Sequence, residues 1–587
     1  MEEQTLRRAV PSTAAATIAE AFRITVEHHP DRVAVRTKDD EVSHTWSELR
    51  DRSDALAGGL AKLGVRRGDT VALMLGNRPE FHVADLAAMT LGATPFSIYA
   101  TFSPEQIAHV VGDAGAKVAL IEAQFADRFE AARADLPELE HVLVLEDGWP
   151  EDPDFDAEPH WRAVEAEDEV TLIYTSGTTG PPKGVQLTHR NVMATIETTR
   201  ALIEFPEGAK VISWLPAAHI AERMAHHYLP IVFGMTITCC PNPREVVGYL
   251  PAVKPTWFFA VPRIWEKLKA GMEGFLLQGD DADRNRAWLE AASQKVELEQ
   301  AGEDVPADLA ATVEEADREL FAGLRAMLGL DEAASVNVGA APTPRAVLVF
   351  FHAIGIPLAE LWGMSETCGA GCCNPTDRVK IGSVGPAGPG VELKLASDGE
   401  LLMRSDVVMT GYRNAPDKTS DALDADGWLH TGDIAKIDDD GYVRIVDRKK
   451  EIIINAAGKN MSPANIESAL KGASPLIGQA CVIGDARPFN TALIVLDADF
   501  GPAWAAQQGI ESADLAVLAD DERVRAAVQA GVDAANERLA RVEQIKRFTL
   551  VRGDWAPGGD EITPTMKLKR KPIAAKYAAE IEALYER

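Results

Sequence analysis

Residues 174–184 read Tyr-Thr-Ser-Gly-Thr-Thr-Gly-Pro-Pro-Lys-Gly, directly after an apolar run at 170–173 that predicts a buried strand. Glycines let a backbone bend until its N–H groups converge on an anion, and hydroxyl side chains add further donors. A lysine in the same loop supplies a positive charge. The stretch therefore predicts a phosphate-binding loop, made of Thr175, Ser176, Gly177, Thr178, Thr179, Gly180 and Lys183.

This loop differs from the Walker A type, in which a Gly-Lys pair is followed at once by Ser or Thr. Here Lys183 comes two prolines after Gly180. An ordinary flexible loop is the alternative, but clustered hydroxyls, glycines and a lysine after a strand favour phosphate binding.

Helix and strand patterns alternate on the N-terminal side of this loop. Thr45 and Glu48 form a predicted capping box, which opens a helix before a strand at 70–75. Ser103 and Gln106 repeat the signal before a strand at 117–121. Such repeated alternation predicts an α/β fold.

The sequence on the C-terminal side of the loop has different patterns. A charged, Ala-rich segment at about 278–332 predicts a helical insertion, and hairpin turns from about 382 to 447 predict a β-rich subdomain. A charged break at 447–451 precedes a new capped helix at Ser462. We predict a large multi-layered α/β N-terminal domain, residues 1–447, and a small mobile α+β C-terminal domain, residues 448–587.

Composition limits the function. With 587 residues the chain is long enough for several domains, and a formal charge of -31 argues against nucleic-acid binding. The N-terminus lacks the apolar segment of a secretory signal, and no apolar run approaches the roughly 20 residues of a membrane span. We therefore expect a cytoplasmic protein. Its six cysteines show no metal-ligand spacing and are expected to be reduced packing residues.

Several further segments, together with the loop, resemble the adenylate-forming superfamily of acyl-CoA synthetases, peptide-synthetase adenylation domains and luciferases. The resemblance runs nearly end to end and keeps the family's order. It implies a nucleotide pocket lined by Gly339, Ala340, Ala341, Pro342, Trp362, Gly363, Met364, Ser365 and Glu366. Ala340 and Trp362 depart from the commoner pattern, in which Gly and Tyr stand at these positions.

The resemblance also implies individual roles. Trp362 would stack on adenine, and Glu366, with Thr175, would hold Mg²⁺ beside the ATP phosphates. Ribose would be bound by Asp433 and Arg448. The remaining roles are a hinge at Lys450, a catalytic lysine at Lys567, a carboxylate-side histidine at His219 and a coenzyme A channel near Gly458.

The implied reaction joins a fatty acid to coenzyme A through an acyl-adenylate made from ATP. Residues 261–267 are similar to long-chain acyl-CoA synthetases of bubblegum type, which favours a long-chain acid. An acyl-AMP ligase that loads a separate acyl carrier protein stays open, although no integrated Leu-Gly-Gly-x-Ser site is present. A non-catalytic acyl- or nucleotide-binding protein is the alternative from another class, against which the joint presence of Lys567, Glu366 and Asp433 argues. Chain length, oligomeric state and peripheral membrane contact stay open.

Overall fold

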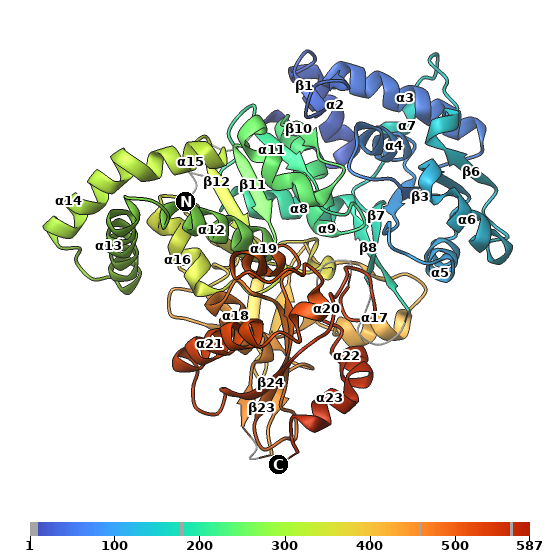
Figure 1. Ribbon diagram of the computed structural model, residues 1–587. Coiled ribbons are helices and arrows are strands. Elements are labelled where there is room, and N and C mark those ends of the chain that lie inside the picture. The colour runs from blue at the N-terminus through green and yellow to red at the C-terminus, as the bar shows by residue number, and fades with distance from the viewer. Residues whose placement is uncertain (1–9, 176–180, 457–458, 564–566, 587) are drawn as a thin grey trace.

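The computed structural model describes residues 10–175, 181–456, 459–563 and 567–586. Its N-terminal part contains a parallel sheet with strand order β4-β3-β5-β6, whose strands alternate with helices (Figure 1). The elements are α3 (Trp46–Lys62), β3 (Thr70–Met74), α4 (Pro79–Thr90), β4 (Thr94–Ser97), α5 (Pro104–Ala114), β5 (Val118–Ile121) and β6 (His141–Val144). Both predicted capping boxes are confirmed, at the starts of α3 and α5.

Two further sheets complete the α/β layers. One has the order β2-β1-β10-β9 and the other β11-β12-β13-β14, and their inner pairs are parallel. Their strands are β1 (Val33–Thr37), β2 (Ser43–Thr45), β9 (Lys210–Ser213), β10 (Thr236–Cys239), β11 (Trp257–Ala260), β12 (Ser335–Val338), β13 (Ala359–Trp362) and β14 (Cys372–Cys373). This mixture of helices with mostly parallel sheets confirms the α/β fold class.

Two antiparallel sheets bring together segments that are far apart in sequence. The first pairs β7 (Glu169–Thr175), β8 (Lys183–Thr188) and β17 (Gly411–Tyr412). The second is a four-stranded sheet of β15 (Glu392–Leu395), β16 (Glu400–Arg404), β18 (Leu429–Ile437) and β19 (Val443–Arg448). The predicted hairpin turns include those at Gly399 and Gly441, and both glycines have positive φ angles.

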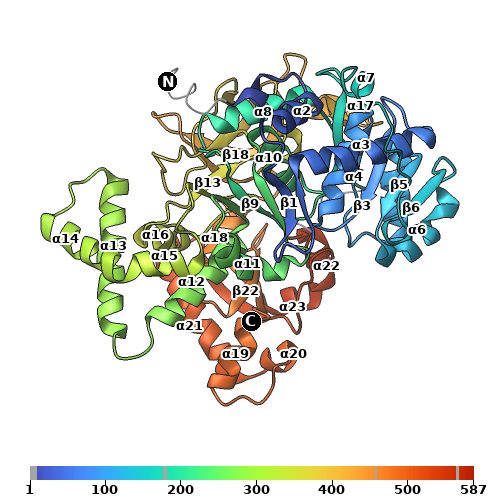
Figure 2. The same cartoon turned by 90° about the horizontal axis from the view of Figure 1, so that it is seen from above.

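Four helices between residues 262 and 328 form an arm at one side of the molecule (Figure 2). The helices are α12 (Pro262–Leu276), α13 (Ala282–Ala301), α14 (Ala307–Ala316) and α15 (Ala322–Leu328), with a π-helical turn at Asp317–Phe321. Gln300 ties this arm to the loop before the second antiparallel sheet, because its side chain bonds Val379 O and Ile381 N.

The C-terminal residues form a separate hydrophobic core. One buried cluster runs from Ala15 to Val443, and another from Ile453 to Leu550. The second surrounds the sheet β22 (Ile477–Ile483), β23 (Asn490–Leu496) and β24 (Ile545–Leu550), which packs against α18 (Pro463–Ala473) and α21 (Glu522–Arg538). The chain ends with α22 (Arg570–Lys576) and α23 (Ala578–Ala583).

Ion pairs join this C-terminal part to α12, beside which it lies in Figure 1. Arg263 pairs with Asp497, and Glu266 with Lys471 at 3.5 Å. Each pair joins a partly exposed basic side chain to a more buried carboxylate, and an interface held by a few such polar contacts is compatible with one that opens. Within the described ranges, no helix combines the length and apolarity that a bilayer crossing requires.

Candidate functional site

The phosphate-binding loop predicted from the sequence connects the two strands of an antiparallel hairpin. Thr175 ends β7 and faces Lys183, the first residue of β8, in the strand register. Ser176, Gly177, Thr178, Thr179 and Gly180 lie outside the described residues. The hairpin therefore holds Thr175 and Lys183 opposite each other at the base of the loop.

Glu366 and Lys183 meet at one tyrosine. The hydroxyl of Tyr412 donates a hydrogen bond of 2.7 Å to Glu366 Oε1, and the ammonium of Lys183 lies 3.9 Å from the centre of the Tyr412 ring. Desolvation lowers the pKa of Lys183, and the nearby charge of Glu366 opposes this shift. Tyr412, which the sequence did not single out, thus contacts both sequence-predicted residues.

Asp433 lies at the centre of a second polar group. Its carboxylate accepts a hydrogen bond of 2.8 Å from the indole N–H of Trp362 and pairs with Arg448 at 2.8 Å. Desolvation raises the pKa of this buried carboxyl, and the Arg448 charge works against that rise. The Trp362 ring is only 8% exposed. Trp362 therefore orients Asp433 through its nitrogen, a role that the sequence did not suggest.

The backbone near these side chains is closely packed. A Cβ at Gly363 would lie 2.2 Å from Gly369 O, so only glycine fits there. Met364 N donates to Thr367 Oγ1, which fixes the turn containing Ser365 and Glu366.

The predicted adenine-side loop follows β12. Gly339 is buried, whereas Ala341 and Pro342 are exposed. Ala340 has a φ angle of 71°, in the left-handed region that glycine favours. Such strain costs of the order of 1 kcal/mol, which accounts for the frequency of glycine here in the family that the sequence resembles.

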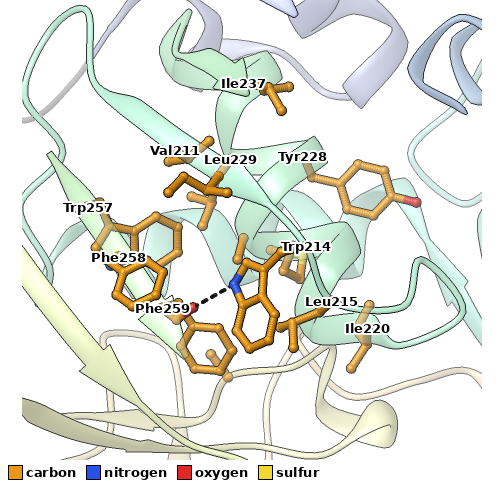
Figure 3. Packing of buried hydrophobic residues seen from close by; sticks show 14 of the residues in the cluster. Val211, Trp214, Leu215, Ile220, Tyr228, Leu229, Ile237, Trp257, Phe258 and Phe259 are labelled. Carbon is orange, nitrogen blue, oxygen red and sulfur yellow. Dashed lines mark hydrogen bonds between the residues drawn. The ribbon is translucent and has the colours of Figure 1, made fainter. Parts of the chain in front are cut away.

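His219 caps α9 (Ile220–Arg223) by accepting a hydrogen bond from Ala221 N at its Nδ1 atom. Burial, and to a smaller extent the charge of Lys567, lower the pKa of His219 to about 3. The ring is therefore neutral near pH 7, with its proton on Nε2. Figure 3 shows buried aromatic and aliphatic residues packed beside this segment, where Trp214 donates its indole N–H to Phe259 O at 3.3 Å.

Lys567 comes from the C-terminal part but lies close to the groups just described. The residue is solvent-exposed, yet surrounding protein desolvates its ammonium enough to lower the pKa, and Arg448 shifts it in the same direction. The charges of Asp433 and Glu366 oppose that shift. Thus the sequence-predicted lysine lies within electrostatic range of both predicted nucleotide-side carboxylates, although it is more than 100 residues from either.

The predicted hinge lies between two anchored residues. Lys449 pairs with Asp398 and Glu400 at 2.6 and 2.8 Å on the antiparallel sheet. Glu451 instead pairs with Arg570 of the C-terminal part at 3.2 Å. Lys450 is the single residue between these opposite attachments. Gly458, the predicted channel residue, lies outside the described residues.

Sequence reasoning missed two side-chain contacts that hold the C-terminal part together or join it to the large part. Arg570 forms a buried structural ion pair with Glu467 at 2.6 Å, which the basic run around it concealed. Asp447 accepts a hydrogen bond of 2.6 Å from Ser462 Oγ and another of 3.2 Å from Ala464 N. It therefore joins the end of β19 to the start of α18. Only the tertiary structure shows either pairing.

The residues fit a magnesium ion that is held mainly by substrate phosphates. Within the described part of the chain, no three His, Cys, Asp or Glu side chains converge as a metal cluster. Magnesium in phosphoryl-transfer sites typically takes one or two carboxylates and completes its shell with phosphate and water. Glu366 Oε1 is bonded to Tyr412, while Oε2 has no hydrogen-bond partner among the described residues. That oxygen suits such a cation.

The chain belongs to the AMP-binding enzyme family, which matches residues 22–413, while the family's C-terminal domain matches residues 450–587. The fadD11 protein of Mycobacterium tuberculosis strain H37Rv is 51% identical over 435 residues, which cover 73% of this chain and 76% of fadD11. Long-chain-fatty-acid–CoA ligase FadD15 of the same strain is 35% identical and covers 92% of both chains. Long-chain-fatty-acid–CoA ligase ACSBG2 of Xenopus laevis is 31% identical and covers 98% of this chain and 85% of its own.

A solved structure has the same fold. The anthranilate CoA ligase AuaEII, in complex with anthranoyl-AMP, superposes with a TM-score of 0.72 at 20% identity, covering 97% of this chain and 98% of its own. The family expected from the sequence motifs is confirmed by the family match and the relatives, and the solved structure confirms the two-part fold.

Proposed function

We propose that the protein is an ATP-dependent ligase that joins a fatty acid to coenzyme A through an acyl-adenylate. The observation that carries the proposal is the convergence of Lys567 with Glu366 and Asp433, from two separately cored parts of the chain. A carboxylate-activating enzyme needs such a set, because attack on ATP builds negative charge between acid and phosphate. Family membership supports the nucleotide, and the names of FadD15 and ACSBG2 support the fatty acid and the thiol.

In the first step, a fatty carboxylate oxygen attacks the α-phosphorus of ATP, and the bond to pyrophosphate breaks. Lys567 stabilises the charge that develops, and Asp433 with Arg448 binds the ribose. Neutral His219 has its Nε2 proton available for the acid's second oxygen. Glu366 and Thr175 would hold Mg²⁺, which would neutralise charge on the phosphates.

In the second step, the thiolate of coenzyme A attacks the acyl carbonyl and AMP leaves. Lys567 shares its surroundings with Asp433 and Glu366, so in this proposal it would withdraw before the thiol approaches. We assign the pivot to Lys450, between the anchors of Lys449 and Glu451. Residues 448–587 would then rotate as one domain, and Gly458 would line the thiol's approach.

The proposal is tested with purified protein, ATP, Mg²⁺ and saturated fatty acids of graded length, with and without coenzyme A. Mass spectrometry quantifies pyrophosphate, acyl-AMP and acyl-CoA. We expect acyl-CoA, AMP and pyrophosphate in equal amounts. Acyl-AMP that accumulates without thioester would instead identify a carrier-loading ligase, and no pyrophosphate with any acid would identify a binding protein.

A further inference from the structure

We propose that Tyr412 is a positioning residue that holds Glu366 in the orientation required for a magnesium–nucleotide complex, while its ring supports Lys183. The inference rests on the proposed function, because it assigns Glu366 to the metal and Lys183 to the phosphates. Tyr412 would itself touch neither the acid nor ATP in this scheme.

The first observation is the hydrogen bond from Tyr412 Oη to Glu366 Oε1, at 2.7 Å between residues that are 8% or less exposed. A hydrogen bond to a buried carboxylate contributes more than a neutral one and restricts the rotation of the carboxylate. With Oε1 bonded, Oε2 is the oxygen left to accept a cation. Among the described residues, Tyr412 is the only donor whose side chain reaches this carboxylate.

The second observation is the position of Lys183. Its ammonium lies 3.9 Å from the centre of the same tyrosine ring, within the range of a cation–π contact. The ring thus prevents Lys183 from collapsing onto Glu366 as a simple ion pair. Such a collapse would neutralise both groups and would remove the carboxylate from the metal.

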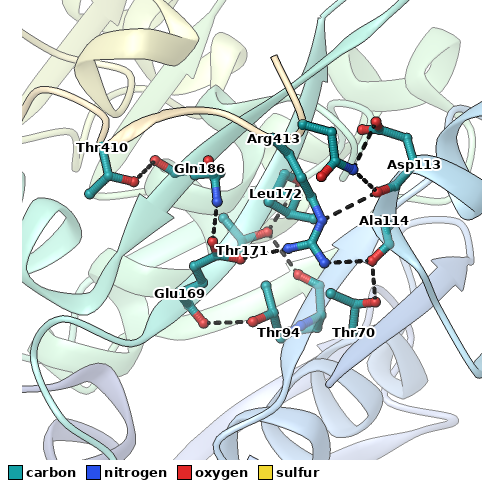
Figure 4. Close-up of polar contacts among 12 residues, drawn as sticks. Thr70, Thr94, Asp113, Ala114, Glu169, Thr171, Leu172, Gln186, Thr410 and Arg413 are labelled. Carbon is teal, nitrogen blue, oxygen red and sulfur yellow. Dashed lines mark hydrogen bonds and ion pairs between the residues drawn. The ribbon is translucent and has the colours of Figure 1, made fainter. Parts of the chain in front are cut away.

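The third observation is how firmly the backbone of Tyr412 is held. Tyr412 lies in β17, which pairs with β8, and its N–H donates to Thr419 Oγ1 at 2.9 Å. The next residue, Arg413, donates to Ala114 O at 2.8 Å and pairs with Glu169 at 3.2 Å (Figure 4). Arg413 N also bonds Gly184 O. The tyrosine is therefore attached to the hairpin that contains Lys183.

These contacts distinguish a positioning role from simple packing. A packing role needs the ring alone, whereas orientation of Glu366 needs the hydroxyl. Tyr412→Phe separates the two, because it removes the oxygen and keeps the ring beneath Lys183. Tyr442→Phe is the matched control, since the hydroxyl of Tyr442 donates to Arg378 O in an exposed turn outside the site.

The test measures the Mg²⁺ concentration that gives half-maximal acyl-AMP formation, together with ATP affinity by calorimetry with and without Mg²⁺. For Tyr412→Phe we expect about a tenfold higher Mg²⁺ requirement and a matching loss of Mg²⁺-dependent ATP affinity. ATP affinity without Mg²⁺ and the thermal midpoint should change little. Tyr442→Phe should match the wild type in every measurement.

Two results would overturn the inference. One is a wild-type Mg²⁺ requirement in Tyr412→Phe, and the other is an equal loss of ATP affinity with and without the ion. If the wild-type protein forms no acyl-AMP, the proposed function fails, and the calorimetric comparison alone still decides the role of Tyr412.

Discussion

The two sides of the candidate site are built differently. On the large side, each key group is held by a neighbour: Glu366 by Tyr412, Asp433 by Trp362, and the His219 ring by Ala221 N. On the C-terminal side, Lys567 is exposed, and no described residue accepts a hydrogen bond from its ammonium. Its backbone is bonded to Thr563 on both sides, because the N–H donates to Thr563 Oγ1 and the C=O accepts from Thr563 N.

This difference fits the proposed rotation of the C-terminal part. Preorganised groups lower a barrier because they pay no reorganisation cost during the reaction. A lysine that serves one step and obstructs the next gains nothing from a permanent partner. The comparison therefore predicts that changes on the C-terminal side separate the two half-reactions, whereas changes on the large side weaken nucleotide binding.

The largest effect is expected for Lys567→Ala. Loss of the ammonium should slow acyl-AMP formation about 10²- to 10³-fold, the scale for removing one charge-stabilising donor. Conversion of synthetic acyl-AMP and coenzyme A to acyl-CoA should stay near the wild-type rate. Lys571→Ala, which removes an exposed neighbouring lysine, is the control. Equal losses in both half-reactions would make the lysine a structural residue.

A smaller effect is expected at the hinge. Proline fixes φ, so Lys450→Pro should slow thioester formation roughly tenfold or more by impeding rotation, while acyl-AMP formation changes little. Lys450→Ala keeps the backbone free and controls for the lost charge. Stopped-flow assays of the separate half-reactions provide the comparison. A pivot elsewhere would leave the proline variant fully competent in both.

On the large side, Trp362→Phe keeps an aromatic ring but removes the donor to Asp433. We expect the KM for ATP to rise about tenfold, since a hydrogen bond to a charged group contributes roughly 1.5–3 kcal/mol. The KM for coenzyme A should not change. Steady-state kinetics with each substrate varied would check this, and a kcat loss at unchanged KM would argue against ribose binding by Asp433.

The smallest effect concerns pH and stability. Burial lowers the pKa of His189 to about 4, so the unfolded chain binds a proton there that the folded chain refuses between about pH 6.5 and 4. The contribution of His189 to the free energy of unfolding should therefore be fully present above pH 6.5, and it should be lost as the pH drops through this window. His189→Asn should reduce the acid sensitivity of the urea midpoint. An unchanged pH slope would show that other groups dominate.

Much of this site could be predicted from the sequence because its chemistry is concentrated in short motifs. The residue types around Lys183 themselves suggest phosphate binding, whereas the metal role of Glu366 and the ribose role of Asp433 are implied by the resemblance of their segments to the family. The α/β class likewise followed from local capping boxes and alternating patterns, both of which depend on near neighbours.

The contacts that orient these groups could not be predicted in the same way. Tyr412 follows a glycine in an unremarkable polar segment, and its partner is 46 residues away. The motif around Trp362 contains an aromatic ring and therefore suggested stacking on adenine. The partner of its indole N–H is Asp433 in β18, which is 71 residues away and which the motif does not contain. In the sequence, Asp447 belongs to a charged run that would be solvated in isolation. In the structure, its carboxylate bonds the start of α18. Such pairings depend on register and domain packing, which no local pattern encodes.

The most direct test joins the large side of the site to the C-terminal part by a disulfide bond. A Cβ at Gly472 in α18 would lie 3.2 Å from Pro344 Cβ on the large side, a few tenths of an ångström below the usual disulfide separation. All six native cysteines are buried, so a Pro344→Cys, Gly472→Cys pair can be oxidised selectively. The account predicts that the oxidised protein forms acyl-AMP but not acyl-CoA, and that reduction restores the thioester. Acyl-CoA formation at the wild-type rate in the cross-linked protein would contradict it.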